Sequence, residues 1–139
     1  MPTDIQSIAR DFFEACETGK GWVGCKEFCT DGASFSSQTD ALDGIATLEG
    51  YTEWMKGLLV ILPDGRYDLK SFSTDADRNR VTAFAVFHGT HTGDGGPVPP
   101  TNQSTAADYV YCMEFDGDKI SHMTKVWNDS ITVRELGWT

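Results

Sequence analysis

The stretch Phe84–Thr101 constrains the fold of this chain more than any other, because it changes abruptly from apolar to glycine- and proline-rich. It reads FAVFHGTHTGDGGPVPPT. Proline cannot donate to a strand ladder and glycine permits bends, so Gly93–Pro100 is expected to connect two strands. The strand before this connection, Arg80–His91, is the longest that the sequence predicts. His91 should therefore lie near the rim of the sheet.

The remaining elements follow from hydrophobic spacing and from turn residues. Up to Leu62 apolar residues recur mainly at helical spacing, and from Arg66 onward the pattern is mainly one of strands. Helices first and a strand meander afterwards predict an α+β fold in one domain, residues 1–139. The first half should contain a helix capped by Thr3 or Asp4 and ended at Glu17–Gly21, a short helix from Trp22 to Thr30–Gly32, a strand Ala33–Ser37 and a helix from Thr47 to Leu62. The strands that follow should be Arg66–Thr74, Arg80–His91, Ser104–Phe115 and Lys119–Trp127. A tight turn at Asp116–Asp118 should join the last two strands.

The chain is strongly acidic, with 21 Asp and Glu against 11 Lys and Arg and a formal net charge of −10. Nucleic acids and anionic membranes need clustered basic residues, so neither is an expected partner. No apolar run approaches the ~20 residues of a membrane span. The N-terminus lacks a charged segment followed by an apolar one, so we expect a cytoplasmic protein.

The four cysteines do not form a recognisable metal motif. Cys25 and Cys29 are four residues apart, but a metal site would need two more soft ligands at comparable spacing, and Cys16 and Cys112 lack it. Buried, reduced thiols are the better interpretation. We therefore expect no metal, and because the sequence has no phosphate loop and no G-x-G-x-x-G motif after a predicted strand, we expect no cofactor either.

Four motifs in the second half of the chain, taken together, resemble a known family. They are Gly89-Thr90-His91-Thr92-Gly93, Pro99-Pro100-Thr101, Asp116-Gly117-Asp118-Lys119-Ile120 and Glu135-Leu136-Gly137. Their order and spacing resemble the SnoaL-like polyketide cyclases, within the superfamily of nuclear transport factor 2 and ketosteroid isomerase. The resemblance implies a cone-shaped α+β barrel, with N-terminal helices packed on a strongly curved, mainly antiparallel sheet.

The inward face of the last two strands is not settled by hydrophobicity, but the resemblance implies it. In similar cyclases a catalytic Asp stands five residues after the Ile of the Asp-Gly-Lys-Ile turn, and here that position is Lys125. A bulge in the strand would instead turn His122 inward, so both remain candidates. The resemblance also implies a role for His91, which could equally be structural. Candidate catalytic residues are Lys125, His91, Tyr111 and His122, and candidate ligand contacts are Phe35, Tyr51, Trp54, Leu58, Phe87, Tyr109, Met113, Met123 and Trp127.

Two classes of function fit these residues. The first is a cyclase or isomerase that removes an acidic C–H proton from a carbonyl compound, which needs a base and a donor to the enolate oxygen. The second is a binding or dimerisation module that has lost the family's Asp. In both, the partner is a small apolar or carbonyl-bearing molecule. A homodimer is also expected, because Phe84 and Val86 make the outer face of the longest strand apolar.

Overall fold

One five-stranded sheet forms the frame of the protein, with strand order β1-β5-β4-β3-β2 in a computed structural model that describes residues 4–139. The strands are antiparallel neighbours except β1, which runs parallel to β5. The elements are α1 (Ile5–Glu17), α2 (Gly21–Cys25), η1 (Lys26–Phe28), β1 (Cys29–Ser37), η2 (Asp40–Leu42), α3 (Leu48–Ile61), β2 (Arg66–Asp75), β3 (Arg80–Thr90), β4 (Ser104–Asp116), β5 (Lys119–Trp127) and α4 (Asp129–Glu135).

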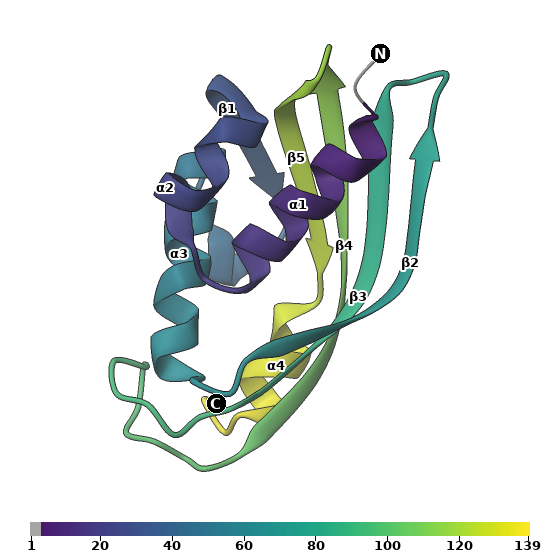
Figure 1. The fold of residues 1–139 in the computed structure, drawn as a ribbon. Coiled ribbons are helices and arrows are strands. Elements are labelled where there is room, and N and C mark those ends of the chain that lie inside the picture. Colours follow the sequence, from purple (N-terminus) through teal and green to yellow (C-terminus); the bar gives the residue numbers. More distant parts are fainter. Residues whose placement is uncertain (1–3) are drawn as a thin grey trace.

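The helices α1, α2 and α3 gather on one face of the sheet, and α4 follows β5 near the C-terminus (Figure 1). Helix α1 begins as predicted, because the Asp4 side chain accepts from the Gln6 backbone N–H at 2.9 Å; Thr3 lies outside the described residues. Its apolar stripe is buried against the sheet at Phe12, Phe13 and Cys16. The predicted α+β fold with a curved, mainly antiparallel sheet is confirmed, although the sheet remains open at its edges.

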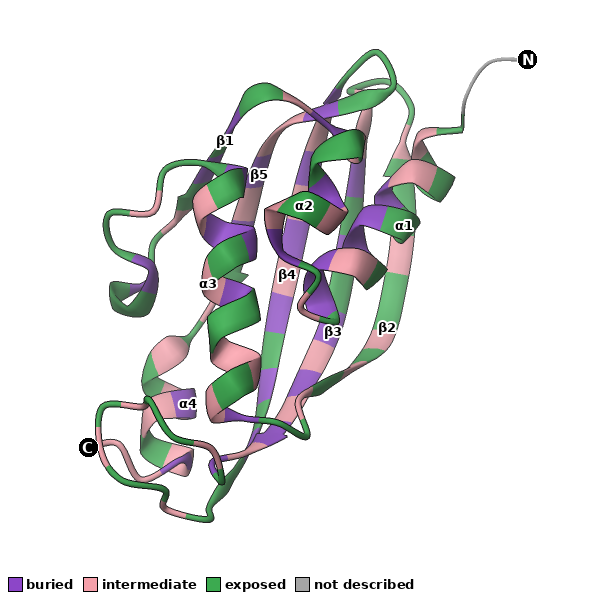
Figure 2. Ribbon diagram, turned by 60° about the vertical axis from the view of Figure 1, so that its left-hand side comes forward, coloured by how far each residue is buried: buried purple, intermediate pink, exposed green. Residues whose placement is uncertain are grey.

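Side chains alternate regularly between the two faces of the central strands. On β3, Val81, Ala83 and Ala85 are fully buried, whereas Phe84 between them is 36% exposed. Figure 2 shows the same alternation of buried and more exposed positions along β3 and β4. The face under the helices therefore carries the core, and the opposite face meets solvent.

Two predictions about the strands are wrong. The longest strand is β4, with 13 residues, whereas Arg80–His91 was expected to be the longest and β3 ends at Thr90 with 11 residues. Residues 29–32 were expected to end a helix, but β1 begins at Cys29, which pairs with Ile120 of β5. The register then shifts before Ser34 pairs with His122. This pairing joins segments far apart in the chain, so local spacing could not reveal it.

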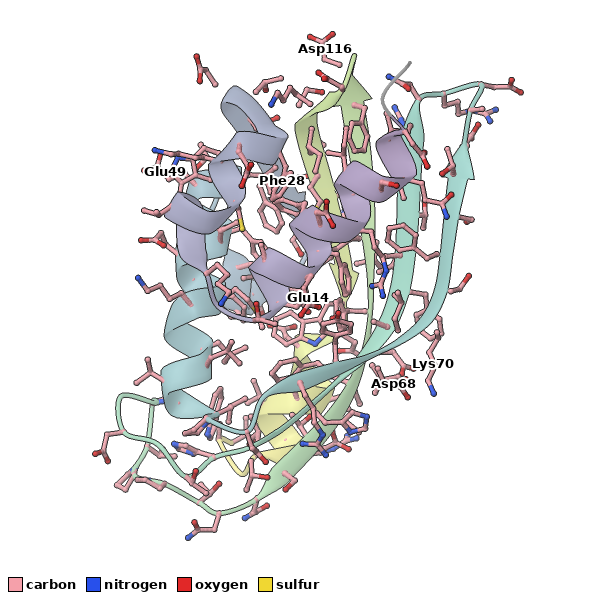
Figure 3. The ribbon with its side chains drawn as sticks, viewed as in Figure 1. Glu14, Phe28, Glu49, Asp68, Lys70 and Asp116 are labelled. Carbon is pink, nitrogen blue, oxygen red and sulfur yellow. The ribbon has the colours of Figure 1, made fainter. Side chains whose placement is uncertain are left out.

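The edge strand β2 carries charged side chains that discourage pairing with another chain. Asp68 and Lys70, labelled in Figure 3, form an exposed ion pair with an N–O distance of 2.7 Å. Among residues 4–139, none of the helices has the length and apolar character needed to cross a membrane.

Candidate active site

The first functional group comes from the end of α1, where Glu17 is 2% exposed. Tyr109 donates to its Oε1, and Tyr111 donates to its Oε2 at 2.5 Å. The two tyrosines alternate with an outward residue on β4, so both rings reach the same face. Burial raises the pKa of Glu17, while the Lys125 charge and the tyrosine hydrogen bonds act in the opposite direction. Protein donors, in place of water, therefore stabilise the charged carboxylate.

Lys125 reaches the same region from β5 and is 6% exposed. Its Nζ donates to the Tyr51 hydroxyl at 3.0 Å and lies 4.3 Å from the ring centroid of Trp127. Burial lowers the pKa of Lys125 to about 8, and the Glu17 charge opposes this shift. We call the rings around the amine, with centroids within 5.9 Å of Nζ, the aromatic cage: Tyr51, Trp54, Tyr109, Tyr111 and Trp127.

A chain of hydrogen bonds joins the amine of Lys125 to the carboxylate of Glu17. Tyr111 uses its hydroxyl proton to donate to Glu17, so its oxygen accepts from Tyr51, and Tyr51 accepts from Lys125. Burial raises the pKa of both tyrosines, so both stay protonated. We call this chain, Lys125–Tyr51–Tyr111–Glu17, the relay. It offers a proton a route between amine and carboxylate that needs no water.

An apolar cavity of about 50 Å³ lies beside these groups. Glu17, Tyr109 and Lys125 supply its main polar atoms, and most of the remaining wall is apolar or aromatic. A single water molecule needs roughly 10–15 Å³ of such a cavity, so this one accommodates a small polar head group. It shares four lining residues with an open groove of about 560 Å³, which offers space for a larger body: Ala41, Trp54, Leu58 and Trp138.

The structure divides the residues that the sequence singled out. Those that line the cavity are Trp54, Leu58, Phe87, Tyr109, Lys125 and Trp127. The buried core outside the cavity wall contains Phe35, Tyr51, Tyr111, Met113 and Met123. Tyr51 and Tyr111 still communicate with the cavity through the relay, whereas the structure places Phe35, Met113 and Met123 in packing positions.

His91 is fully buried but does not line the cavity. Its Nδ1 accepts from the indole N–H of Trp138 at 2.9 Å, and the ring packs edge-on against that indole. The backbone N–H of Thr101 also points to Nδ1, at 3.4 Å. His91 therefore ties the connection after β3 to the C-terminus, which favours its structural interpretation over a role in the pocket.

His122 lies on the opposite face of the sheet from Lys125. The bulge in β5 falls between the Phe115–Ile120 and Glu114–His122 pairs, and the register is regular from His122 to Lys125. Strand alternation therefore keeps the two side chains apart. The ring of His122 instead contacts hydroxyl groups, with Nδ1 2.6 Å from Ser34 Oγ and Nε2 3.0 Å from Ser36 Oγ.

Sequence reasoning missed Glu17, which was interpreted as part of a helix end. One signal was available, because Glu17 follows Phe13 by four residues and so continues the apolar stripe of α1. An acid at that position suggests a buried carboxylate with partners elsewhere. Those partners lie on β4, too far along the chain for local patterns to identify.

Comparisons with known proteins agree with this arrangement of elements. The family model described as SnoaL-like polyketide cyclase matches residues 7–136. AclR, a proposed hydroxylase from Streptomyces galilaeus, gives a TM-score of 0.78 at 20% identity, covering 97% of this chain and 82% of that one. IdmH, a proposed polyketide cyclase from Streptomyces antibioticus, gives 0.79 at 17% identity, covering 97% and 99%. Among curated proteins, none matches the chain significantly.

Proposed function

The chain belongs to the SnoaL-like polyketide cyclase family, and from that premise we propose that it is a cofactor-free cyclase or isomerase of a carbonyl compound. The observation that carries this proposal is that a buried carboxylate, Glu17, and a buried amine, Lys125, line the same apolar cavity. Proton abstraction next to a carbonyl needs a base at the carbon and a donor at the oxygen. The cavity offers one group of each kind.

In the proposed reaction, Glu17 takes the C–H proton and the Lys125 ammonium stabilises the developing enolate oxygen. The raised pKa of Glu17 makes it a stronger base than an exposed carboxylate. Tyr109 holds the carboxylate in place through its hydrogen bond to Oε1. The family's Asp is absent at position 125, and the carboxylate of Glu17, at the end of α1, takes its role as the base.

The shape of the site indicates how a substrate would bind. The carbonyl end enters the small cavity beside Lys125, and the apolar body lies in the groove between α3 and the segment around Pro97. Trp54 and Trp138 border both spaces, so their indoles contact the substrate where it passes from groove to cavity. A flat, mainly apolar ketone meets these requirements.

Deuterium exchange at the α-carbon of α-tetralone, followed by proton NMR in heavy water, tests this function. Wild-type protein should accelerate the exchange, and Glu17→Gln and Lys125→Met should each reduce the acceleration roughly a hundredfold, which is typical of losing a positioned acid or base. His122→Ala is the matched control on the other face and should exchange like wild type. Absence of acceleration by the wild-type protein would contradict the proposal.

A binding module without turnover is the second candidate, and the observation that favours it is Lys125 at the position of the family's Asp. Three indoles line the cavity, those of Trp54, Trp127 and Trp138, so ligand entry should quench tryptophan fluorescence. Quenching by α-tetralone without any accelerated exchange would identify a binding protein.

We also propose that a second copy of the chain covers the outer face of the sheet. Phe84 is 36% exposed and Val126 62% exposed on this face, and both are cross-strand neighbours of Val110, so the three form one apolar row across β3, β4 and β5. The two-fold pairing of identical faces is the commonest solution for such a surface. Sedimentation velocity at micromolar concentration should show a dimer that Phe84→Asp dissociates, and a monomeric wild type would reject this proposal.

A further inference from the structure

We propose that Lys125 is a nucleophile that forms a covalent imine with aldehydes and ketones that enter the cavity. The inference rests on the proposed carbonyl-binding pocket but assigns Lys125 a different role, in which the amine bonds to the carbonyl carbon. Three features of the described structure support it: the isolation of this amine, its connection to Glu17, and its position on the cavity wall.

Lys125 differs from every other lysine of the chain. All six lysines fall within the described residues, and the other five are exposed: Lys20, Lys26, Lys56, Lys70 and Lys119. Within residues 4–139, no carboxylate lies within 4.0 Å of the Lys125 Nζ. Its polar partner is the Tyr51 hydroxyl, and the remaining neighbours are the rings of the aromatic cage. An amine desolvated by apolar groups is more readily neutral, and only the neutral amine is nucleophilic.

The relay gives the amine a place to leave its proton. When that proton passes through Tyr51 and Tyr111 to Glu17, the ammonium–carboxylate pair becomes a neutral amine and a carboxylic acid. The pKa of Lys125 falls to about 8 and that of Glu17 rises, both through burial, so both shifts favour the neutral pair. The same carboxylic acid can later return a proton to the reacting oxygen.

The chemical step balances without any further reagent. The nitrogen lone pair attacks the carbonyl carbon, the C–O π bond breaks, and one proton passes from the nitrogen to the oxygen, which gives a neutral carbinolamine. Glu17, as a carboxylic acid, protonates this oxygen, which leaves as water while the C=N bond forms, and the resulting iminium returns its N–H proton to the Glu17 carboxylate. The net reaction converts amine and carbonyl compound to imine and water. For a ketone with an α-proton, Glu17 in its charged form can then remove that proton and give an enamine.

Reductive trapping with benzaldehyde and sodium cyanoborohydride tests the inference, because hydride transfer fixes an imine as a benzylamine. At pH 7.5, peptide mapping by mass spectrometry should find Lys125 benzylated roughly tenfold or more faster than the exposed lysines. The five exposed lysines serve as internal controls in the same sample. Lys125→Arg, which keeps a cation but has no nucleophilic amine, should lose the fast phase, and Tyr51→Phe should slow it because the relay is broken. The inference is overturned if Lys125 is labelled no faster than Lys119.

The α-tetralone exchange separates this inference from the proposed function. Exchange without fast labelling of Lys125 leaves the acid–base function standing and overturns the imine. Fast labelling without exchange supports the imine and contradicts proton abstraction by Glu17. The two measurements use different probes, so failure of one does not imply failure of the other.

Discussion

Two polar side chains of strand β5, Lys125 and His122, lie three residues apart and face opposite sides of the sheet. Hydrogen bonds connect Lys125 through two tyrosines to a buried carboxylate. His122 instead forms hydrogen bonds with serine hydroxyls of β1 that are exposed to water. The two residues are close in the sequence, and the face of the sheet on which each lies determines its burial and its hydrogen-bond partners.

The same contrast separates two carboxylates. Glu17 is buried and accepts from two tyrosines, whereas Glu114 pairs with Arg80 across β3 and β4 at 3.2 Å with both side chains partly exposed. A buried charge depends on its protein partners for stabilisation, whereas water can replace the partner of an exposed charge. The same substitution should therefore cost more free energy of unfolding at a buried group than at an exposed one.

The largest expected effect is the loss of stability in Glu17→Ala. This variant leaves the Tyr109 and Tyr111 hydroxyls without their acceptor and Lys125 without a nearby anion, which should cost about 3–5 kcal/mol of unfolding free energy. Glu114→Ala should cost only about 0–1 kcal/mol. Urea denaturation measures both, and equal losses would remove the distinction between the two faces.

The second prediction concerns the pH dependence of stability. The folded-state pKa of Lys125 is about 8, below its usual value of 10.5, so between these two pH values the unfolded chain binds more protons. Lys125 should therefore make stability rise with pH across this window, by at most about 1.4 kcal/mol per pH unit. Lys125→Met lacks this contribution, so the difference between the two unfolding free energies should change from pH 8 to pH 10. A constant difference would show that the amine is not desolvated.

A smaller effect is expected from Trp127→Leu. The Trp127 ring centroid lies 4.3 Å from the Lys125 Nζ, and its π face favours the charged amine. Leucine keeps the site apolar but removes this attraction, so the pKa of Lys125 should fall further, by roughly half a unit to one unit. Side-chain NMR of ¹⁵N-labelled lysine follows the change, and a rise of the pKa would indicate that the substitution admits water.

The smallest effect is expected from His122→Ala. Its hydroxyl partners remain accessible to water after the substitution, so the unfolding free energy should change by less than about 1 kcal/mol. Fluorescence quenching by α-tetralone should also match wild type. A weakened interaction with the ligand would mean that the two faces of the sheet are coupled.

The sequence predicted much of the sheet because its signals are local. Alternation and the glycine- and proline-rich connection placed β5 at Lys119–Trp127 and β3 and β4 within one residue of their observed ends. The start of β1 escaped prediction because it depends on pairing with β5. Local sequence patterns were therefore enough to place the regular strands β3, β4 and β5, whereas the start of the irregular strand β1 depends on contacts with a distant segment.

The site was predicted only in part, for the same reason. Strand alternation and the family resemblance identified Lys125, Tyr109 and Tyr111. Glu17 could not be recognised as their partner, because 92 residues separate it from Tyr109. The division between cavity wall and closed core likewise depends on how α3 and α4 pack, which strand alternation does not describe.

Lys125 is held as a desolvated amine in the aromatic cage, and a side-chain NMR titration of the ¹⁵N-labelled protein is the decisive measurement of that state. We expect Lys125 to titrate with a pKa of about 8, well below the usual lysine value of 10.5, and Glu17→Gln to lower this pKa further by removing the opposing charge. A Lys125 pKa at the usual lysine value, unchanged in Glu17→Gln, would contradict desolvation of this amine.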